Sequence, residues 1–194
     1  MLHYDIFLAV VISYLFGSIQ TAVIICKIMG YPDPRTQGSG NPGATNVLRM
    51  GGKKAAILTL LGDLCKGFIP VMAAQYYGLD SLGLSAVAFA AFLGHIYPLF
   101  SHFKGGKGVA TALGCLLALA WPVGLALICT WLIMAMLFRY SSLAALTAAV
   151  LAPLYIWYFT NIDYTVMVSF MSILLVYRHK NNILRLIKGE EGRI

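Results

Sequence analysis

Long apolar runs alternate with short polar segments along the whole chain. The runs cover residues 4–26, 55–77, 81–100, 109–120, 122–138, 143–159 and 164–177. An α-helix rises about 1.5 Å per residue, so roughly 20 apolar residues cross about 30 Å of hydrocarbon. Most of the runs approach that length, although 109–120 is short and 164–177 is near the lower limit. The pattern predicts an all-α polytopic membrane protein.

The number of spans depends on residues 109–138, which form either one span or two. Trp121-Pro122 interrupts this stretch, and a proline is a plausible helix boundary. If the stretch is split, there are seven spans, and thirteen of the fourteen Lys and Arg residues lie on one side, with Lys66 inside the second span. A single span would place Arg139 on the opposite side. By the positive-inside rule the basic side is cytoplasmic, so the N-terminus is predicted to be periplasmic and the C-terminus cytoplasmic.

The composition agrees with a membrane protein. Of 194 residues, 60% are hydrophobic and 11% are charged, whereas soluble domains have about 25% charged residues. We therefore interpret the net charge of +7 first as a signal of membrane topology rather than of nucleic-acid binding. The N-terminus lacks a basic n-region, so the first run is expected to stay as a helix. We expect one membrane domain over residues 1–194, with a frayed end at 188–193.

Four cysteines are scattered singly through the apolar runs, at Cys26, Cys65, Cys115 and Cys129. None has the Cys-x-x-Cys spacing of a metal or redox motif. We interpret them as reduced, small hydrophobic residues.

The first polar island is rich in glycine and carries short polar side chains. It reads Gly38-Ser39-Gly40-Asn41-Pro42-Gly43-Ala44-Thr45-Asn46 and is followed by Arg49. Glycines allow positive φ, so that successive N–H groups can converge on one anion, and Ser, Thr and Asn add short donors. Arg49 would supply a bidentate charge. The island predicts a phosphate site; the alternative is a flexible connector.

The second polar island is Lys104-Gly105-Gly106-Lys107-Gly108, which enters a predicted helix at Val109. A helix N-terminus presents N–H groups and partial positive charge to an anion, and glycine lets a phosphate approach the backbone. Lys107 would contact that phosphate. The alternative is a cytoplasmic anchor with loop glycines. The spacing is not that of a Walker motif, so nucleotide hydrolysis is not indicated.

Two further polar segments fall on the same predicted face, Arg139-Tyr140-Ser141-Ser142 and Tyr177-Arg178-His179-Lys180-Asn181-Asn182. The Ser142 hydroxyl is either a helix N-cap or a ligand. The basic run after Tyr177 is either a membrane anchor or part of a site. His179 and Asn182 are three residues apart, so on a continuing helix they share a face.

Polar residues also occur within the apolar runs. Asp63 and Lys66 are three apart, and we expect a mutual ion pair that positions the helix, with direct substrate contact as the alternative. His95 and His102 lack acidic neighbours at metal-ligand spacing and are interpreted as helix-end residues. Gly17-Ser18 and Gln20 predict a close helix approach and a buried hydrogen bond.

Several catalytic motifs are absent from the sequence. It contains no His-x4-Asp pair, no Gly-x-Ser-x-Gly elbow and no cluster of aspartates for a metal-dependent phosphotransferase. The site is therefore predicted to hold phosphate rather than to activate a nucleophile of its own.

Taken in order along the whole chain, these motifs strongly resemble those of the bacterial acyl-phosphate:glycerol-3-phosphate acyltransferases, the PlsY family. The matching residues are Gly38 to Asn46 with Arg49, Asp63-x-x-Lys66-Gly67, Gly94-His95-x-Tyr97-Pro98, Phe103 to Thr111, Arg139-Tyr140-x-Ser142 and Tyr177-Arg178-His179. The resemblance implies a seven-helix enzyme of the bacterial inner membrane with a cytoplasmic active site. It implies acyl transfer from acyl phosphate to the 1-hydroxyl of glycerol 3-phosphate, which gives lysophosphatidic acid and phosphate and begins phospholipid synthesis.

The same resemblance implies that no metal, cofactor, acyl-CoA or acyl carrier protein takes part. The expected partners are acyl phosphate, glycerol 3-phosphate and the lipid bilayer, without nucleic acid, and a monomer is expected. Six residues are expected to be catalytic: Ser39, Arg49, Lys107, Ser142, His179 and Asn182. Ten more are expected to bind substrate: Gly38, Gly40, Asn41, Gly43, Thr45, Asn46, Lys104, Gly105, Gly106 and Gly108.

Acyl phosphate is already activated, so the protein has mainly to orient the reactants and stabilise developing negative charge. We expect the leaving phosphate to accept the hydroxyl proton, and His179 as general base is the rival hypothesis. A transporter for a phosphorylated solute is the main alternative function, but it would show polar residues across the membrane depth and an internal repeat. A structural subunit would leave the Asp63–Lys66 pair and the two glycine-rich islands unexplained.

Overall fold

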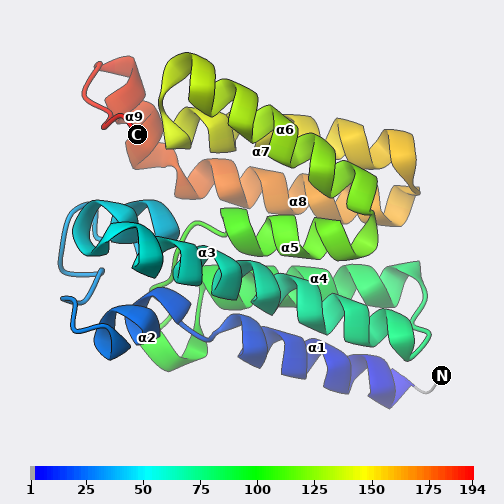
Figure 1. Ribbon diagram of the computed structural model, residues 1–194. Coiled ribbons are helices and arrows are strands. Elements are labelled where there is room, and N and C mark those ends of the chain that lie inside the picture. Colours follow the sequence, from blue (N-terminus) through cyan, green and yellow to red (C-terminus); the bar gives the residue numbers. More distant parts are fainter. Residues whose placement is uncertain (1–2) are drawn as a thin grey trace. The chain divides into compact units, whose positions relative to one another are not determined.

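The computed structural model describes residues 3–194, with side chains from residue 5 onward, and this part of the chain contains helices and no strand. In chain order these are α1 His3–Gly17, α2 Thr21–Ile28, α3 Ala44–Tyr76, α4 Ser81–Ile96, the 3-10 turn η1 Leu99–Ser101, α5 Val109–Leu119, α6 Trp121–Phe138, α7 Ser141–Phe159, α8 Ile162–Arg178 and α9 Lys180–Ile187 (Figure 1). The helices form two compact units, the first ending at Ala118 and the second running from Leu119 to Ile194.

Every apolar run of the sequence is largely helical, as predicted. Within the described residues, four helices are long and apolar enough to cross a membrane, namely α3, α4 extended through η1, α6 and α7, and the bent pair α1–α2 makes a fifth. The helices α5 and α8 are shorter, at 11 and 17 residues. The all-helical membrane architecture is confirmed, and the count of seven spans stays a prediction.

The first apolar run is bent rather than continuous. Its helix ends at Gly17, resumes at Thr21 and turns by 40°. At the break, the Ile19 carbonyl accepts from the Thr21 N–H at 3.2 Å and from Lys66 Nζ at 2.8 Å. Breaks of this kind are tolerated at membrane depth where another group satisfies the backbone. The cation inside the next span thus stabilises the bend.

Small residues bring the helices of the first unit into backbone contact. A Cβ atom on Gly17 would fall against the Ala91 carbonyl of α4, and one on Gly94 against the Tyr14 carbonyl of α1. The predicted close approach at Gly17 is therefore confirmed, and α4 also packs against α3. Small residues at crossings are typical of membrane helices, whose association depends on packing and hydrogen bonds.

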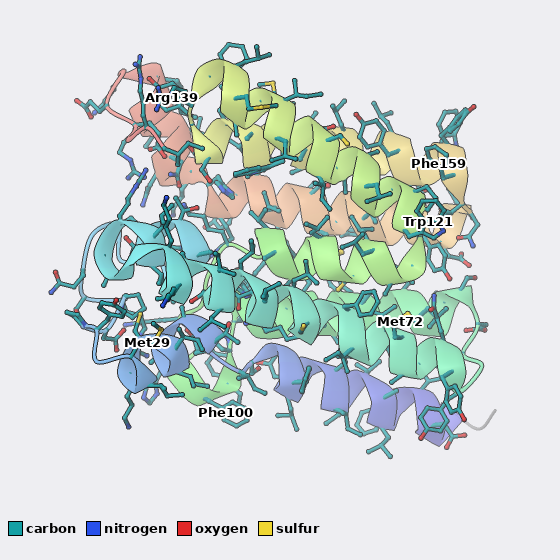
Figure 2. The ribbon with its side chains drawn as sticks, viewed as in Figure 1. Met29, Met72, Phe100, Trp121, Arg139 and Phe159 are labelled. Carbon is teal, nitrogen blue, oxygen red and sulfur yellow. The ribbon has the colours of Figure 1, made fainter. Side chains whose placement is uncertain are left out.

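In the second unit, α7 packs against both α6 and α8. The chain breaks at Ala120, and Pro122 lies in the first turn of α6, where its missing N–H costs no hydrogen bond. The predicted boundary at Trp121-Pro122 is confirmed. Figure 2 shows Trp121 and Phe159 near one end of the α6–α7 pair and Arg139 at the other.

Large apolar side chains are exposed along most of the helices (Figure 2). Examples are Ile57, Leu61 and Met72 on α3 and Leu132 and Met136 on α6, all more than 40% exposed. Soluble monomers rarely expose apolar patches of this extent. The surface therefore suits contact with lipid.

Candidate active site

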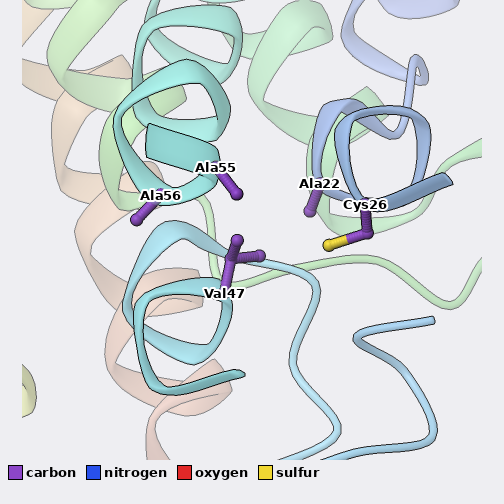
Figure 3. Close-up of a cluster of buried hydrophobic side chains, with 5 residues drawn as sticks. All are labelled: Ala22, Cys26, Val47, Ala55 and Ala56. Atoms are coloured by element: carbon purple, nitrogen blue, oxygen red, sulfur yellow. The ribbon is translucent and has the colours of Figure 1, made fainter. Parts of the chain in front are cut away.

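A small apolar cluster holds the segment that carries the first polar island. Ala22 and Cys26 of α2 pack with Val47, Ala55 and Ala56 of α3 (Figure 3). Val47 lies before Gly52 and the two alanines lie after it, and Gly52 has φ 79°, so α3 is kinked there. Only glycine adopts this backbone conformation without strain. The kink lets α2 contact both arms of α3.

The first island is half loop and half helix. Residues 38–43 form the loop, whereas Thr45, Asn46 and Arg49 belong to the first turns of α3, with Gly43 as N-cap. Gly38 and Gly40 have φ of 59° and 69°, as the glycine-rich sequence predicts. Ser39 and Arg49 are exposed.

Asn46 is buried beneath this loop and organises it. Its Oδ1 accepts from the Ser39 N–H at 2.9 Å, and its Nδ2 donates to the carbonyls of Pro34 at 2.9 Å and Gln37 at 3.1 Å. A Cβ on Gly38 would collide with the Asn46 amide. The structure therefore shows Asn46 bonded to the loop itself, which is a different task from the ligand expected from sequence.

Three of the loop N–H groups that were expected to converge on an anion donate to the loop itself. The Ser39 N–H binds Asn46, the Gly40 N–H donates to Gln37 O at 2.9 Å, and the Gly43 N–H donates to Asn41 O at 2.9 Å. Loop closure uses these donors because short turns satisfy their own backbone. Contacts of this loop with a ligand would then be made mainly by its side chains.

The second island packs closely on the end of α4. The Gly105 N–H donates to Ile96 O and the Gly106 N–H to His95 O, both at 3.2 Å. A Cβ on Gly105 would meet the His95 carbonyl, and one on Gly106 would meet the His95 imidazole. Both glycines are buried. The glycines permit contact with α4, whereas the sequence suggested that they permit contact with phosphate.

The helix after this loop begins at Val109, as predicted. Gly108 has φ 89°, and a Cβ there would fall against the Phe92 ring. Lys104 is exposed and Lys107 is half-buried. The loop thus supports two cations on a backbone that is fixed from below.

Asp63 and Lys66 form the predicted ion pair, with Lys66 Nζ 2.9 Å from Asp63 Oδ1 and both side chains buried. Thr21 donates to the same carboxylate oxygen. His95 and Thr111 complete a buried polar cluster in the first unit.

A second polar cluster lies in the second unit and centres on Glu191. Its Oε1 accepts from Ser142 Oγ at 2.8 Å and from Asn182 Nδ2 at 2.6 Å, and its Oε2 accepts from Arg185 Nε at 2.7 Å. Burial alone would raise the pKa of Glu191, but the hydrogen bonds from Ser142, Arg185 and Asn182 outweigh it and hold the pKa below its ordinary value. The carboxylate is therefore ionised at neutral pH.

This cluster corrects the expectation of a frayed end at 188–193. The tail returns to the start of α7: Arg193 Nε contacts Tyr140 Oη at 3.5 Å and the Ile194 N–H donates to Arg139 O at 2.8 Å. The buried Glu191 carboxylate gathers three donors, and these hold the tail. Ser142 is not an N-cap, since no side chain caps α7.

His179 lies between α8 and α9 and is buried. Its Nδ1 is 2.8 Å from Leu175 O. A carbonyl only accepts, so Nδ1 carries the proton, and an acid–base role of this ring would fall to Nε2. Asn182 of α9 is also buried, and the chain breaks at His179 between α8 and α9, so the shared face on a continuing helix stays a prediction.

Comparison with known proteins assigns this architecture to a family. The family model for glycerol-3-phosphate acyltransferase matches residues 7–189. The chain belongs to the glycerol-3-phosphate acyltransferase family. The resemblance noted in the sequence is thereby confirmed.

Curated relatives in this family match nearly the full length. A glycerol-3-phosphate acyltransferase of Methylococcus capsulatus is 60% identical over 183 residues, which are 94% of this chain and 92% of the relative. One from Ralstonia nicotianae is 56% identical over 189 residues, covering 95% and 91%.

A crystal structure of PlsY, described as an integral membrane glycerol 3-phosphate acyltransferase in its glycerol 3-phosphate form, matches with a TM-score of 0.92 and 42% identity over 98% of this chain and 96% of that one. Its lysophosphatidic acid form matches with a TM-score of 0.88 and 40% identity, covering 98% and 95%.

The structure joins some of the expected site residues within each of the two units. Ser39 and Asn46 are joined in the first loop, Lys104 to Gly108 rest on α4, and Ser142 and Asn182 meet through Glu191. Glu191 was missed because the tail lacks hydrophobic periodicity. Its one signal was a pair of carboxylates, Glu190 and Glu191, between two glycines in a chain with only seven acidic residues.

Proposed function

We propose that this chain transfers a fatty acyl group from acyl phosphate to the 1-hydroxyl of glycerol 3-phosphate. The hydroxyl oxygen attacks the acyl carbonyl carbon and a new ester C–O bond forms. The C–O bond to phosphate breaks, and inorganic phosphate leaves with the hydroxyl proton. The products are lysophosphatidic acid and phosphate, and the reaction would begin phospholipid synthesis.

The observation that carries this proposal is the match to one solved protein in two forms. Those structures, 42% and 40% identical to this chain, are described as glycerol 3-phosphate and lysophosphatidic acid forms. Glycerol 3-phosphate and lysophosphatidic acid differ by one acyl group. They are therefore acceptor and product of a single acyl transfer.

The donor is inferred from what the site residues supply. Two polar loops carry cations, through Arg49 on α3 and Lys104 and Lys107 before α5. A reaction whose acceptor and donor both contain phosphate needs two such anion contacts. The sequence has no His-x4-Asp pair, which also favours a donor with a good leaving group over a thioester.

We propose roles for individual residues that agree with the contacts of each. Ser39 and Arg49 are placed with substrate phosphate, because both side chains are exposed on the first loop and helix. We assign Lys107 to phosphate or the developing negative charge, and Ser142, His179 and Asn182 to the acceptor and the transferring carbonyl. Asn46 supports the first loop, and Glu191 holds Ser142 and Asn182.

We further propose that the chain crosses the bacterial inner membrane seven times. The helices α5 and α8 would be the two spans below the usual length. The N-terminus would be periplasmic and the C-terminus cytoplasmic, because thirteen of the fourteen basic residues then fall on the cytoplasmic side.

The test is phosphate release by the purified, detergent-solubilised protein given palmitoyl phosphate. The proposal is supported if phosphate release requires glycerol 3-phosphate. It is also supported if the rate of release falls by on the order of 100-fold or more in Lys107→Ala. Palmitoyl-CoA in place of palmitoyl phosphate is expected to give no product. A folded wild-type protein that releases no phosphate would overturn the proposed reaction.

The proton acceptor is tested by a pH–rate profile of His179→Gln. If the leaving phosphate accepts the proton, the variant is slower but keeps the shape of the wild-type profile. If His179 is the base, acting through Nε2, the limb of the profile near its pKa disappears.

A further inference from the structure

The buried polar cluster of the first unit lies against the second glycine loop. Asp63 Oδ1 is 2.9 Å from Lys66 Nζ and 3.6 Å from His95 Nδ1, and these side chains are at most 6% exposed. Lys66 also binds Ile19 O at the α1–α2 break. A charged pair at membrane depth is costly and is retained where it has a task.

Thr111 fixes the imidazole of His95 within this cluster. Its hydroxyl donates to the Asp63 carbonyl at 2.9 Å, since a carbonyl can only accept. The same oxygen is 3.1 Å from His95 Nδ1, so it accepts from that nitrogen. Nδ1 is therefore protonated, and it faces both Thr111 and the Asp63 carboxylate, which hold the ring in one orientation.

His95 in turn supports the loop at Gly105-Gly106. Its carbonyl accepts from the Gly106 N–H at 3.2 Å, and its ring fills the space that a side chain on Gly106 would occupy. Gln20, next to the α1–α2 break, donates to Lys104 O at 3.3 Å. The loop is thus held at its start by Gln20 and at its centre by His95.

We propose that Asp63, His95 and Thr111 are positioning residues for acyl transfer. They act through the Gly105-Gly106 backbone on Lys107 and do not touch substrate. The inference rests on the proposed function, because the loop matters to the reaction only if Lys107 does. A displacement of about 1 Å in such a loop can cost on the order of 100-fold in rate.

A double-mutant cycle separates the contact of the His95 ring from that of its backbone. Gly106→Ala would collide with the ring, whereas Gly105→Ala would collide with the His95 carbonyl. Each alone is expected to lower kcat/KM for glycerol 3-phosphate at least tenfold, to order of magnitude. In a His95→Ala background, Gly106→Ala should lower kcat/KM by roughly twofold or less, because the ring is gone. Gly105→Ala should lower kcat/KM there as much as it does in the wild-type background. An unchanged Gly106 penalty would refute the ring contact.

Conservative variants test whether the orientation of the ring matters beyond stability. His95→Asn keeps an amide donor near the position of Nδ1, so we expect it to retain activity better than His95→Gln, whose amide reaches further. Thr111→Val removes the hydroxyl at constant shape and should lower kcat more than it raises KM for acyl phosphate. Asp63→Asn leaves Lys66 buried beside a neutral amide; if that variant does not fold, Thr111→Val is the test of the same cluster.

The control is Ser13→Ala, which removes a buried helix–helix hydrogen bond to Val87 O of 2.7 Å in the same unit. It should lower the melting temperature as much as Thr111→Val does while kcat/KM stays within about twofold of wild type. Equal losses of activity in the two variants would mean that the cluster is only structural.

A readout without turnover separates this inference from the proposed function. Amide hydrogen exchange at Gly105 and Gly106 should accelerate in Thr111→Val and His95→Gln, but not in Ser13→Ala. Failure of wild type to turn over would overturn the proposed reaction and leave the exchange result intact. Turnover by wild type, with unchanged exchange and activity in both cluster variants, would overturn the positioning role.

Discussion

At the scale of single residues, two buried polar side chains near the candidate site, Asn46 and Glu191, bind other parts of the protein. Asn46 uses both ends of its amide inside the first loop, and Glu191 binds three side chains from two helices. The sequence placed Asn46 correctly in a polar island but could not tell a ligand from a support. The distinction depends on where the Pro34 and Gln37 carbonyls lie.

Replacing Glu191 by Gln is expected to lower the free energy of unfolding by about 1–3 kcal/mol, because the ion pair with Arg185 is lost and the bonds from Ser142 and Asn182 weaken. Activity should fall as well, since those two side chains lose their anchor. Thermal unfolding in detergent measures the first effect and phosphate release the second. Glu190→Gln is the matched control, because Glu190 is exposed. A stability loss as large in that control would contradict the assignment.

The lowered pKa of Glu191 predicts that the stability of the protein depends on pH. The pKa of Glu191 in the folded protein lies below its ordinary value of 4.5, so the folded state favours the ionised form. The stabilisation is present above that ordinary value and is lost as the pH falls through the lowered one. Between wild type and Glu191→Gln, the difference in melting temperature should therefore shrink on acidification below about pH 4.5.

At the scale of elements, apolar runs predicted the helices well, because lipid-facing and buried faces are both apolar and the runs are long. The break at Trp121-Pro122 and the start of α5 at Val109 followed from residue type. The bend between α1 and α2 did not, because it depends on Lys66 reaching Ile19 O from another helix. The packing of Gly105 and Gly106 against α4 was also not predicted, because only the fold shows which atoms lie against these glycines.

The crossing of α3 and α5 provides a test at this scale. A Cβ on Gly67 would meet the Thr111 carbonyl, and one on Gly114 would meet the Leu64 carbonyl. Backbone cannot move as a side chain can, so Gly67→Ala and Gly114→Ala should each destabilise the protein by about 1–3 kcal/mol. Melting temperatures in detergent provide the measurement. Ala73→Leu adds volume on an exposed position of α3 and should change little; similar losses there would argue against the crossing.

At the scale of the whole molecule, the membrane topology is predicted mainly from the positions of the Lys and Arg residues. Thirteen of the fourteen basic residues fall on one side if the chain crosses seven times. That count includes the short helix α5, whose 11 residues span about 17 Å at 1.5 Å per residue. Length alone therefore does not decide whether α5 is a separate membrane crossing. The side of the membrane on which Arg139 lies does decide it. The family and its membrane character followed from the sequence; the exact crossing count awaits a measurement of sidedness.

Cysteine labelling can measure that sidedness. The four native cysteines, all unpaired, are first replaced, and single cysteines are introduced as Tyr77→Cys and Lys188→Cys, both at exposed positions. In spheroplasts, a membrane-impermeant maleimide should label the first and reach the second only after permeabilisation, because the positive-inside rule places residue 188 in the cytoplasm. A third variant, Arg139→Cys, separates seven crossings from six. Seven crossings put residue 139, like residue 188, on the side opposite to residue 77, whereas one continuous span over 109–138 would put residues 77, 139 and 188 on the same side. Labelling of residue 139 in intact spheroplasts would rule out α5 and α6 as separate crossings, and with them a cytoplasmic location for the start of α7 and Ser142.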